Sequence, residues 1–260
     1  MIKLTILHDE AENFMEELSG FSVLVEAFGL RILCDTSFKD QIIKNAHKAG
    51  KNISNIDYII LSHGHLDHTE GLKYINYSGI KNVTAHPCCF EKKWDCTSGV
   101  FCGCPVSLEE LQKKTNVILS REPYWLIKDE IVFLGEIPRE NDFESKSPED
   151  KTEKNDRDPV NDDSALAIKT DKGLIIISGC SHSGICNIIE YAEKVTDTKV
   201  YAVLGGFHLF NKEITDKTID YLKKKGVPKI CPMHCLNEYA FEEFEKVGGM
   251  RIKTLQELIF

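Results

Sequence analysis

The chain has 260 residues, 42% of them hydrophobic, and a formal net charge of −9 at pH 7. This length suits one large domain or two small ones, and the apolar content suffices for a sizeable core. The acidic balance argues against a general nucleic-acid binder, which needs a basic surface to displace counterions. No apolar run approaches a membrane span, and the N-terminus alternates like a strand without a signal-peptide core. We therefore expect a cytoplasmic protein with neither a membrane nor a nucleic-acid partner.

The first third of the chain predicts strands followed by a helix and a further strand. Phe28-Gly29 reads as a hairpin turn between the second and third strands. Ser37 is predicted to cap a helix whose apolar face includes Ile42 and Ile43, and Gly50 is predicted to end it. A second helix is predicted to begin at Thr69. The predicted strands are Lys3–His8, Phe21–Glu26, Leu30–Cys34 and Ile56–Leu61.

The second half repeats this order of strands and helices. Two hairpins are predicted, each across a short polar turn. The predicted elements are the hairpins Trp125–Lys128/Ile131–Leu134 and Ala165–Thr170/Leu174–Ser178, strands Val200–Leu204 and Lys229–Pro232, a helix through Ile188–Ala192 and a helix at Thr215–Lys225. Two sets of strands with flanking helices indicate an α/β sandwich of two sheets with the helices outside.

One segment, residues 140–163, has a different composition. It contains ten acidic and four basic residues, two prolines and few large apolar side chains. Such a composition buries too little surface to order itself, so a mobile surface loop is the simpler interpretation. The functional alternative is a lid over an active site, because long loops in compact domains often have that role.

A histidine cluster directly follows the predicted strand Ile56–Leu61. His63, His65, Asp67 and His68 place three imidazoles and a carboxylate within six residues. These groups are suitable ligands for Zn²⁺ and related divalent ions. Core packing does not require such a cluster, because each neutral buried imidazole needs partners for both ring nitrogens. A polar surface loop with chance histidines is the alternative.

Three later histidines also follow predicted strands. They are His182, His208 and His234. We interpret His208 as a group that contacts substrate or transfers a proton. The remaining histidines, His8, His47 and His86, are predicted to be structural.

The pattern His-x-His-x-Asp-His after an apolar run resembles the signature of the metallo-β-lactamase fold superfamily. The strings SHGHLDHTEGL, GCSHSGICNII, LGGFHL and PMHC, with Asp35 and Asn45, resemble the branch named for 7,8-dihydropterin-6-methyl-4-(β-D-ribofuranosyl)aminobenzene-5′-phosphate synthase. The resemblance covers nearly the whole chain and implies one four-layer αββα domain over residues 1–260. It is less specific to one reaction, because the branch consists mostly of proteins described only as metal-dependent hydrolases.

The resemblance also implies a dinuclear metal site. His63 and His65 would hold one ion, completed by His182, and Asp67, His68 and His234 would hold the other. Asp67 and His208 are the predicted catalytic residues. The ions are predicted to be zinc, because a related flavodiiron class, which binds iron, has a carboxylate where this chain has His65. Mn²⁺ and Fe²⁺ are the alternatives.

This chain departs from the superfamily pattern in its middle. The superfamily has a lone histidine before the second hairpin pair and an aspartate after it. Here Asp162 or Asp163 occupies the first place and Cys180 lies near the second. The roles of Asp163 and Cys180 therefore stay open, and Cys180 has a plain alternative as a small buried residue.

Ten cysteines are many for a cytoplasmic protein, and without an export signal we expect reduced thiols rather than disulfides. Five of them match no standard zinc or iron–sulfur spacing, so inert thiols are predicted, with a structural metal as the alternative. These five are Cys88, Cys89, Cys96, Cys102 and Cys104.

Three functions follow. The first is a metal-dependent hydrolase of a small phosphorylated or ester-type substrate, in which a bound ion lowers the pKa of water to near 7. The second is the condensation named by the branch, which joins a pterin-like substrate to a ribofuranosyl-aminobenzene phosphate. The third is a non-catalytic metal or redox sensor that uses the cysteine-rich segment. The sequence does not predict an oligomeric state.

Overall fold

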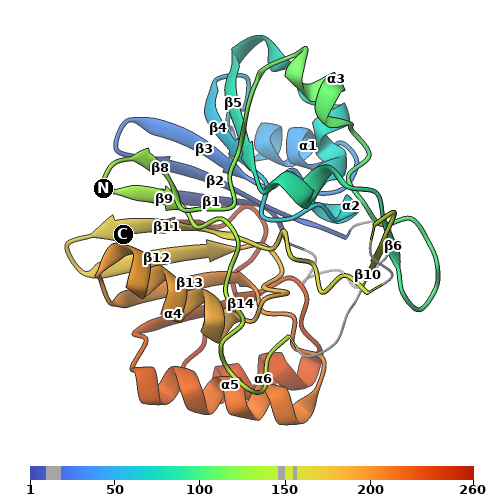
Figure 1. Ribbon diagram of the computed structural model, residues 1–260. Coiled ribbons are helices and arrows are strands. Elements are labelled where there is room, and N and C mark those ends of the chain that lie inside the picture. The colour runs from blue at the N-terminus through green and yellow to red at the C-terminus, as the bar shows by residue number, and fades with distance from the viewer. Residues whose placement is uncertain (10–18, 146–149, 155–156) are drawn as a thin grey trace.

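The computed structural model describes residues 1–9, 19–145, 150–154 and 157–260, and its strands form two large sheets packed face to face (Figure 1). The first sheet has the order β15-β1-β2-β3-β4-β5-β7. Its strands are β1 (Lys3–Asp9), β2 (Phe21–Ala27), β3 (Leu30–Cys34), β4 (Ile56–Ile60), β5 (Ile80–Ala85), β7 (Asn116–Leu119) and β15 (Glu257–Ile259). The predicted strands at the start of the chain are present, within two residues of their expected bounds.

The second sheet has the order β14-β13-β12-β11-β9-β8. Its strands are β8 (Tyr124–Ile127), β9 (Ile131–Phe133), β11 (Ala165–Thr170), β12 (Gly173–Ser178), β13 (Val200–Gly206) and β14 (Lys229–Met233). Both predicted hairpins are confirmed as antiparallel pairs. A separate two-stranded sheet joins β6 (Lys93–Asp95) to β10 (Asp150–Thr152).

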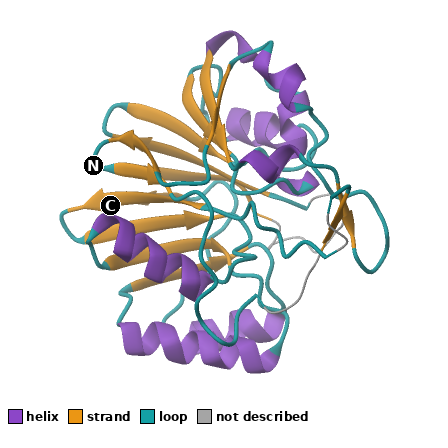
Figure 2. Ribbon diagram, in the orientation of Figure 1, coloured by secondary structure: helices purple, strands orange, loops and turns teal. Residues whose placement is uncertain are grey.

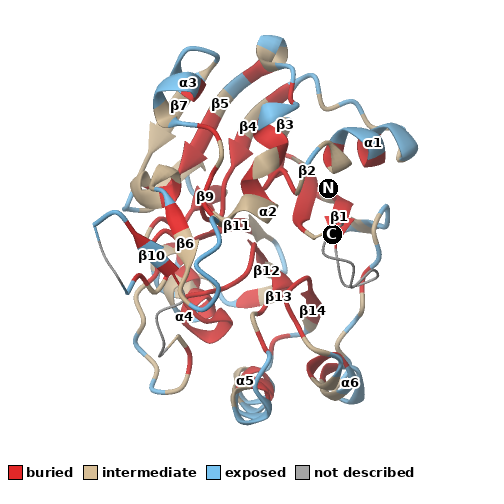
Figure 3. Ribbon diagram, turned by 90° about the vertical axis from the view of Figure 1, so that its right-hand side faces the viewer, coloured by how far each residue is buried: buried red, intermediate tan, exposed pale blue. Residues whose placement is uncertain are grey.

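Helices cover the outer face of each sheet (Figure 2). Those against the first sheet are α1 (Gln41–Lys48), α2 (Leu66–Thr69) and α3 (Leu108–Gln112), and those against the second are α4 (Ile185–Thr196), α5 (Lys212–Lys225) and α6 (Glu238–Lys246). Viewed from the side where β6 and β10 lie, exposed residues gather on the outer helices and buried ones on the strands between them (Figure 3). Among the described residues, no helix is both long and apolar enough to span a membrane.

Three apolar clusters fill the three spaces between these four layers. One packs α1 against the first sheet, one lies between the sheets, and one packs α4, α5 and α6 against the second sheet. Strand β12 contributes side chains to two of these clusters. Leu174 and Ile176 belong to the cluster beneath the helices, and Ile175 and Ile177 belong to the cluster between the sheets. Because side chains alternate along a strand, a continuous apolar run fills both faces of a buried sheet. The expected αββα sandwich is confirmed.

The strand directions bring distant loops to one edge of the sandwich. β3, β4, β5 and β7 run parallel to one another, as do β12, β13 and β14. β1 has the direction of β3, because each is antiparallel to β2. The carboxyl ends of parallel strands meet at one edge, where open α/β sheets usually carry their sites.

The predicted helix after β3 differs from the structure at its start. Ser37 has a φ of +58°, whereas a helix N-cap adopts an extended conformation, so Ser37 cannot cap this helix. The helix begins at Gln41 after Asp40, and Ile43 is 38% exposed rather than part of the apolar face. The next helix begins at Leu66, three residues before the predicted Thr69, and continues as a 3₁₀ turn at Glu70–Lys73.

The described residues of the acidic segment 140–163 make specific contacts with the rest of the chain. Residues 146–149 and 155–156 lie outside the described part. In the rest, β10 pairs with β6, and Lys93 forms buried ion pairs with Asp158 at 3.2 Å and Asp162 at 2.5 Å. A buried lysine thus partly compensates the charges of these residues, and the mobile loop and the lid both stay predictions.

Candidate metal centre

The loops at the carboxyl edge bring the six predicted metal ligands around one space. The first group comprises His63 and His65 after β4 and His182 after β12. One ring nitrogen from each lies within 4.8 Å of the others. The imidazole centroids are 4.6 Å apart for His63 and His65, 4.8 Å for His63 and His182, and 4.7 Å for His65 and His182. The sequence-predicted first ligand group is thus assembled from both halves of the chain.

The second predicted group is also assembled from both halves. His68 Nε2 lies 3.0 Å from His234 Nε2, and the Oδ2 atom of Asp67 lies 3.4 Å from His234 Nε2 and 3.7 Å from His68 Nε2. Cys180 Sγ lies 3.1 Å from His68 Nε2 and also belongs to a possible donor group with His63 and His68. Cys180 is buried, as its plain alternative predicts, and its sulfur lies between the two groups.

Asp35, at the end of β3, fixes the orientation of two imidazoles. Its carboxylate accepts hydrogen bonds from the backbone N–H and hydroxyl of Ser62 and from His68 Nδ1, each at 2.7 Å. An ionised carboxylate only accepts, so Ser62 donates its proton and its oxygen then accepts from His63 Nδ1 at 2.8 Å. His63 and His68 consequently direct an unprotonated Nε2 into the shared space.

These donor positions fit divalent ions. His63 Nε2 faces His65 Nδ1 at 3.0 Å, and His68 Nε2 faces His234 Nε2 at the same distance. Tetrahedral ligands at about 2.1 Å from an ion are about 3.4 Å apart, and the donor separations here span 3.0 to 3.7 Å. Carboxylate and hydroxyl partners on the outer ring nitrogens are what metal-binding histidines normally have.

The electrostatics of the cluster agree with this arrangement. Burial, together with the neighbouring imidazoles, lowers the pKa of His63 well below its ordinary value, which keeps the ring neutral and able to bind a metal. Burial alone would raise the pKa of Asp67, but the imidazoles of His68 and His234 outweigh it and lower this pKa. A neutral His63 ring thus lies beside an ionised Asp67, whereas at His65 the opposing effect of burial is outweighed by the carboxylate of Asp150, which raises the pKa of this ring.

The backbone around the cluster is strained and tightly packed. Asp35, Ser181, His208 and His234 all have φ between +51° and +60°, a region that non-glycine residues rarely adopt. Such conformations collect at functional sites, where the surrounding structure enforces them. A Cβ atom on Gly179 would lie 2.0 Å from the Ser62 hydroxyl, so only glycine permits the two ligand loops to approach this closely.

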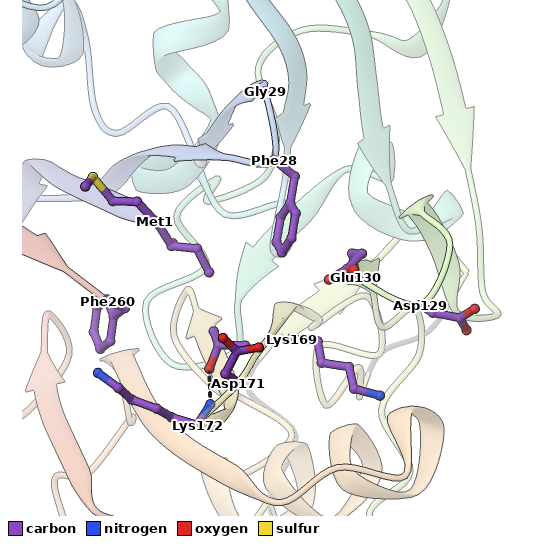
Figure 4. A pocket seen from close by; sticks show the side chains of 11 residues that line it. Met1, Phe28, Gly29, Asp129, Glu130, Lys169, Asp171, Lys172 and Phe260 are labelled. Atoms are coloured by element: carbon purple, nitrogen blue, oxygen red, sulfur yellow. Dashed lines mark hydrogen bonds between the residues drawn. The ribbon is translucent and has the colours of Figure 1, made fainter.

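A cavity of about 370 Å³ opens onto the cluster. Its lining includes donors from both groups, and Phe38, Leu66 and Phe101 provide apolar walls. The predicted catalytic residues Asp67 and His208 both line it, and the His208 ring lies 4.4 Å from that of His182. A larger cavity, of about 770 Å³, lies at the opposite edge among hairpin turns and the chain termini (Figure 4).

Asp162 and Asp163, whose roles the sequence left open, do not line the cavity but bind the backbone of the loops that carry the predicted ligands. Asp162 Oδ2 accepts a hydrogen bond from the backbone N–H of Gly64, between His63 and His65, at 2.7 Å. Asp163 Oδ2 accepts from the backbone N–H of Ser183, next to His182, at 2.9 Å. Each therefore positions a loop that carries histidines.

The three histidines predicted to be structural lie outside the cavity lining. His8 Nδ1 is 3.2 Å from Asn45 Nδ2, His47 is on the exposed side of α1, and His86 contacts Glu136 at 3.1 Å.

The five clustered cysteines occupy different surroundings. Cys89 and Cys104 are buried in the apolar cluster behind the first sheet, and Cys88 contacts Arg121 at 3.2 Å. Cys102 instead lines the cavity, where it forms a possible donor group with His65 and Asp150. This dispersal favours the interpretation as reduced thiols over one shared structural metal.

Sequence reasoning missed Cys102, Cys235 and Asp150 as cavity residues. Cys235 directly follows the predicted ligand His234 at the end of β14, so its position in the sequence could have indicated that it lies at the cavity. Asp150 had none, because it is one of ten acids in a segment without periodicity.

Comparison with known proteins gives consistent matches. A family model described as the metallo-β-lactamase superfamily matches residues 15–87. The chain is 39% identical to the 7,8-dihydropterin-6-methyl-4-(β-D-ribofuranosyl)-aminobenzene-5′-phosphate synthase of Methanocaldococcus jannaschii, over 90% of this chain and 88% of that protein. It is 36% identical to an uncharacterized protein of the same organism, over 96% of this chain and 95% of that one.

A solved structure is similar over its whole length. The crystal structure of Tm1679, a metal-dependent hydrolase of the β-lactamase superfamily, aligns with a TM-score of 0.85 and 27% identity. The alignment covers 100% of this chain and 99% of that one.

Proposed function

Because the chain belongs to the metallo-β-lactamase superfamily, in the branch of the dihydropterin-ribofuranosylaminobenzene-phosphate synthase, we propose that it catalyses a metal-dependent condensation of that type. The substrates would be a dihydropterin and a ribofuranosyl arylamine phosphate, or close analogues of them. The observation that carries this proposal is the 39% identity to the named synthase across 90% of this chain. The cavity supports it, because flat rings suit the apolar walls formed by Phe38, Leu66 and Phe101.

In the proposed enzyme, His63, His65 and His182 would hold one divalent ion and Asp67, His68 and His234 would hold the other, and Cys180 would offer an additional sulfur donor. Zinc is the proposed ion, with Mn²⁺ or Fe²⁺ as alternatives. When bound, such ions neutralise charge on phosphoryl oxygens and lower the pKa of bound water.

The proposed reaction forms one bond and breaks one. The arylamine nitrogen bonds to the methylene carbon on C6 of the dihydropterin, the bond from that carbon to a diphosphate group breaks, and the nitrogen loses a proton. His208 is the proposed proton acceptor, because it lines the cavity beside the ligand group yet belongs to neither predicted ion site. Asp67 contributes a negative charge at the cavity surface.

The test is to incubate the metal-loaded protein with the dihydropterin diphosphate and the arylamine phosphate and to analyse the products by mass spectrometry. We expect a coupled product that disappears after chelation and returns when metal is added back. The variant His208→Gln should retain its metal and lose most of the product. A metal-loaded parent that forms no coupled product would contradict the proposal.

Hydrolysis of a small phosphorylated or ester-type substrate is the second candidate. The similarity to Tm1679 over the whole chain favours it. In addition, the 36% identity to an uncharacterized relative is close to the 39% identity to the synthase, so whole-chain similarity alone does not select the condensation. A panel of phosphoesters and lactones, assayed under the same metal conditions, separates the two: turnover of panel members without a coupled product would favour hydrolysis.

A further inference from the structure

His65 differs from His63 and His68 in the residue that contacts the ring nitrogen on the side away from the shared space. The partners of His63 and His68 are Ser62 and Asp35, which belong to the ends of core strands. The Nε2 atom of His65 instead lies 2.7 Å from Oδ2 of Asp150, and its Nδ1 atom faces His63 Nε2 at 3.0 Å. The acidic segment therefore supplies a partner to one of the predicted ligands.

Asp150 is held in place by its own backbone and is buried. It is the first residue of β10 and pairs with Asp95 of β6, and it exchanges two backbone hydrogen bonds with Asp158 at 2.8 and 3.1 Å. Its side chain is 4% exposed, against 14% for His65. Because Lys93 on β6 binds Asp158, the same buried ion pair fastens the strip that carries Asp150.

We propose that Asp150 is a positioning residue that couples the pairing of β10 with β6 to metal binding at His65. The inference rests on the proposed metal centre. A carboxylate at Nε2 keeps the proton on that nitrogen, which leaves the Nδ1 lone pair directed at the site shared with His63 and His182. Coupling between two equilibria is reciprocal, so a metal that favours this tautomer also favours the pairing of β10 with β6.

Another use of the same atoms is a separate ion held by His65 Nε2, Asp150 and Cys102. These three donors lie within 4.8 Å of one another, and Cys102 Sγ is 3.6 Å from Asp150 Oδ1. The 2.7 Å contact between His65 Nε2 and Asp150 favours a direct hydrogen bond, since ligands of one tetrahedral zinc are about 3.4 Å apart.

The experiment measures Zn²⁺ affinity and stoichiometry by competition with a chromophoric chelator in four proteins: the parent, Asp150→Ala, Asp150→Asn and Glu153→Gln. Glu153 is on the same segment, 61% exposed, and pairs with Lys92, so it controls for changed charge. For Asp150→Ala we expect about a 10- to 100-fold weaker affinity at one of two sites. Asp150→Asn retains an acceptor oxygen and should lose less, and Glu153→Gln should match the parent.

Two further readouts do not depend on activity. Long-range ¹H–¹⁵N spectra of the zinc-loaded parent should show His65 protonated at Nε2, and this signal should weaken in Asp150→Ala. Hydrogen exchange at residues 150–154 should slow when Zn²⁺ is added to the parent but not when it is added to Asp150→Ala.

The outcomes separate this inference from the proposed function. A parent that binds two ions with an Asp150→Ala variant of equal affinity would overturn the positioning role and leave the metal centre standing. Three ions in the parent, one of them lost in Cys102→Ser, would overturn it in favour of a separate site. A parent that binds none of Zn²⁺, Mn²⁺ and Fe²⁺ would overturn both proposals.

Discussion

The two edges of the sandwich each have a cavity, but the cavities are lined by different kinds of side chain. At the carboxyl edge, a cavity of about 370 Å³ is lined by histidines, cysteines and carboxylates, of which Asp150 is buried. At the opposite edge, a cavity of about 770 Å³ lies among hairpin turns, and its lining in the described chain contains no histidine or cysteine. Converging donor atoms with hydrogen-bonded partners, rather than the size of a cavity, are therefore our reason for proposing the carboxyl edge as the functional end.

The difference follows from how the strands are joined. Two antiparallel pairs, β2/β3 and β11/β12, are connected at the opposite edge by the tight turns Phe28-Gly29 and Asp171-Lys172, which leave few residues for a site. Parallel neighbours need a crossover, so longer loops leave their carboxyl ends. Those loops carry His63, His182 and their neighbours, and the strained conformations noted above occur in them.

The largest expected effect comes from removing one donor of each ion site. The double variant His65→Ala/Asp67→Ala should weaken metal binding by more than about 100-fold, because loss of a direct ligand costs more than loss of its outer partner. It should also abolish metal-dependent turnover while the circular dichroism spectrum stays unchanged. The control is His47→Ala, on the exposed side of α1. A double variant that keeps its metal and turnover would show that the carboxyl edge is not the functional end.

A smaller effect, on stability, is expected from removing the buried ion pairs between Lys93 and the acidic segment. Lys93→Met leaves Asp158 and Asp162 without their buried cation and should lower the free energy of unfolding by about 3–5 kcal/mol in urea titrations. Lys92→Met is the matched control, because Lys92 is 63% exposed and its ion pair is worth at most about 1 kcal/mol. Equal losses in the two variants would mean that the buried ion pair does not fasten the segment.

The smallest effect is expected at the opposite edge. Asp171 is exposed and lines the larger cavity, so Asp171→Asn should change the unfolding free energy by no more than about 0.5 kcal/mol. Metal content and turnover should match the parent. Reduced turnover would instead give the larger cavity a part in the reaction and remove the contrast between the two ends.

Local patterns predicted much of this molecule. Alternation and apolar runs located the strands, and the order of strand, histidine loop and helix anticipated that both halves contribute to one site. The histidines share the same edge because parallel strands carry them, which is a topological consequence that the strand pattern already contains.

What local patterns missed depends on contacts between segments far apart in sequence. Asp150 reaches His65 through pairing of β10 with β6. Ser37 resembles an N-cap in sequence, but it adopts a positive φ and its carbonyl accepts a hydrogen bond from the backbone N–H of the distant Gly71. The composition of residues 140–163 pointed to a solvated loop because the compensating charge of Lys93 lies some 65 residues away.

The central claim is that two ion sites are assembled from both halves of the chain. Elemental analysis of the purified protein, combined with anomalous scattering from its crystals, tests this most directly. We predict two ions per chain, one among His63, His65 and His182 and the other among Asp67, His68 and His234. No ion at these positions in metal-supplemented crystals, or ions bound only at Cys102 and Asp150, would contradict it.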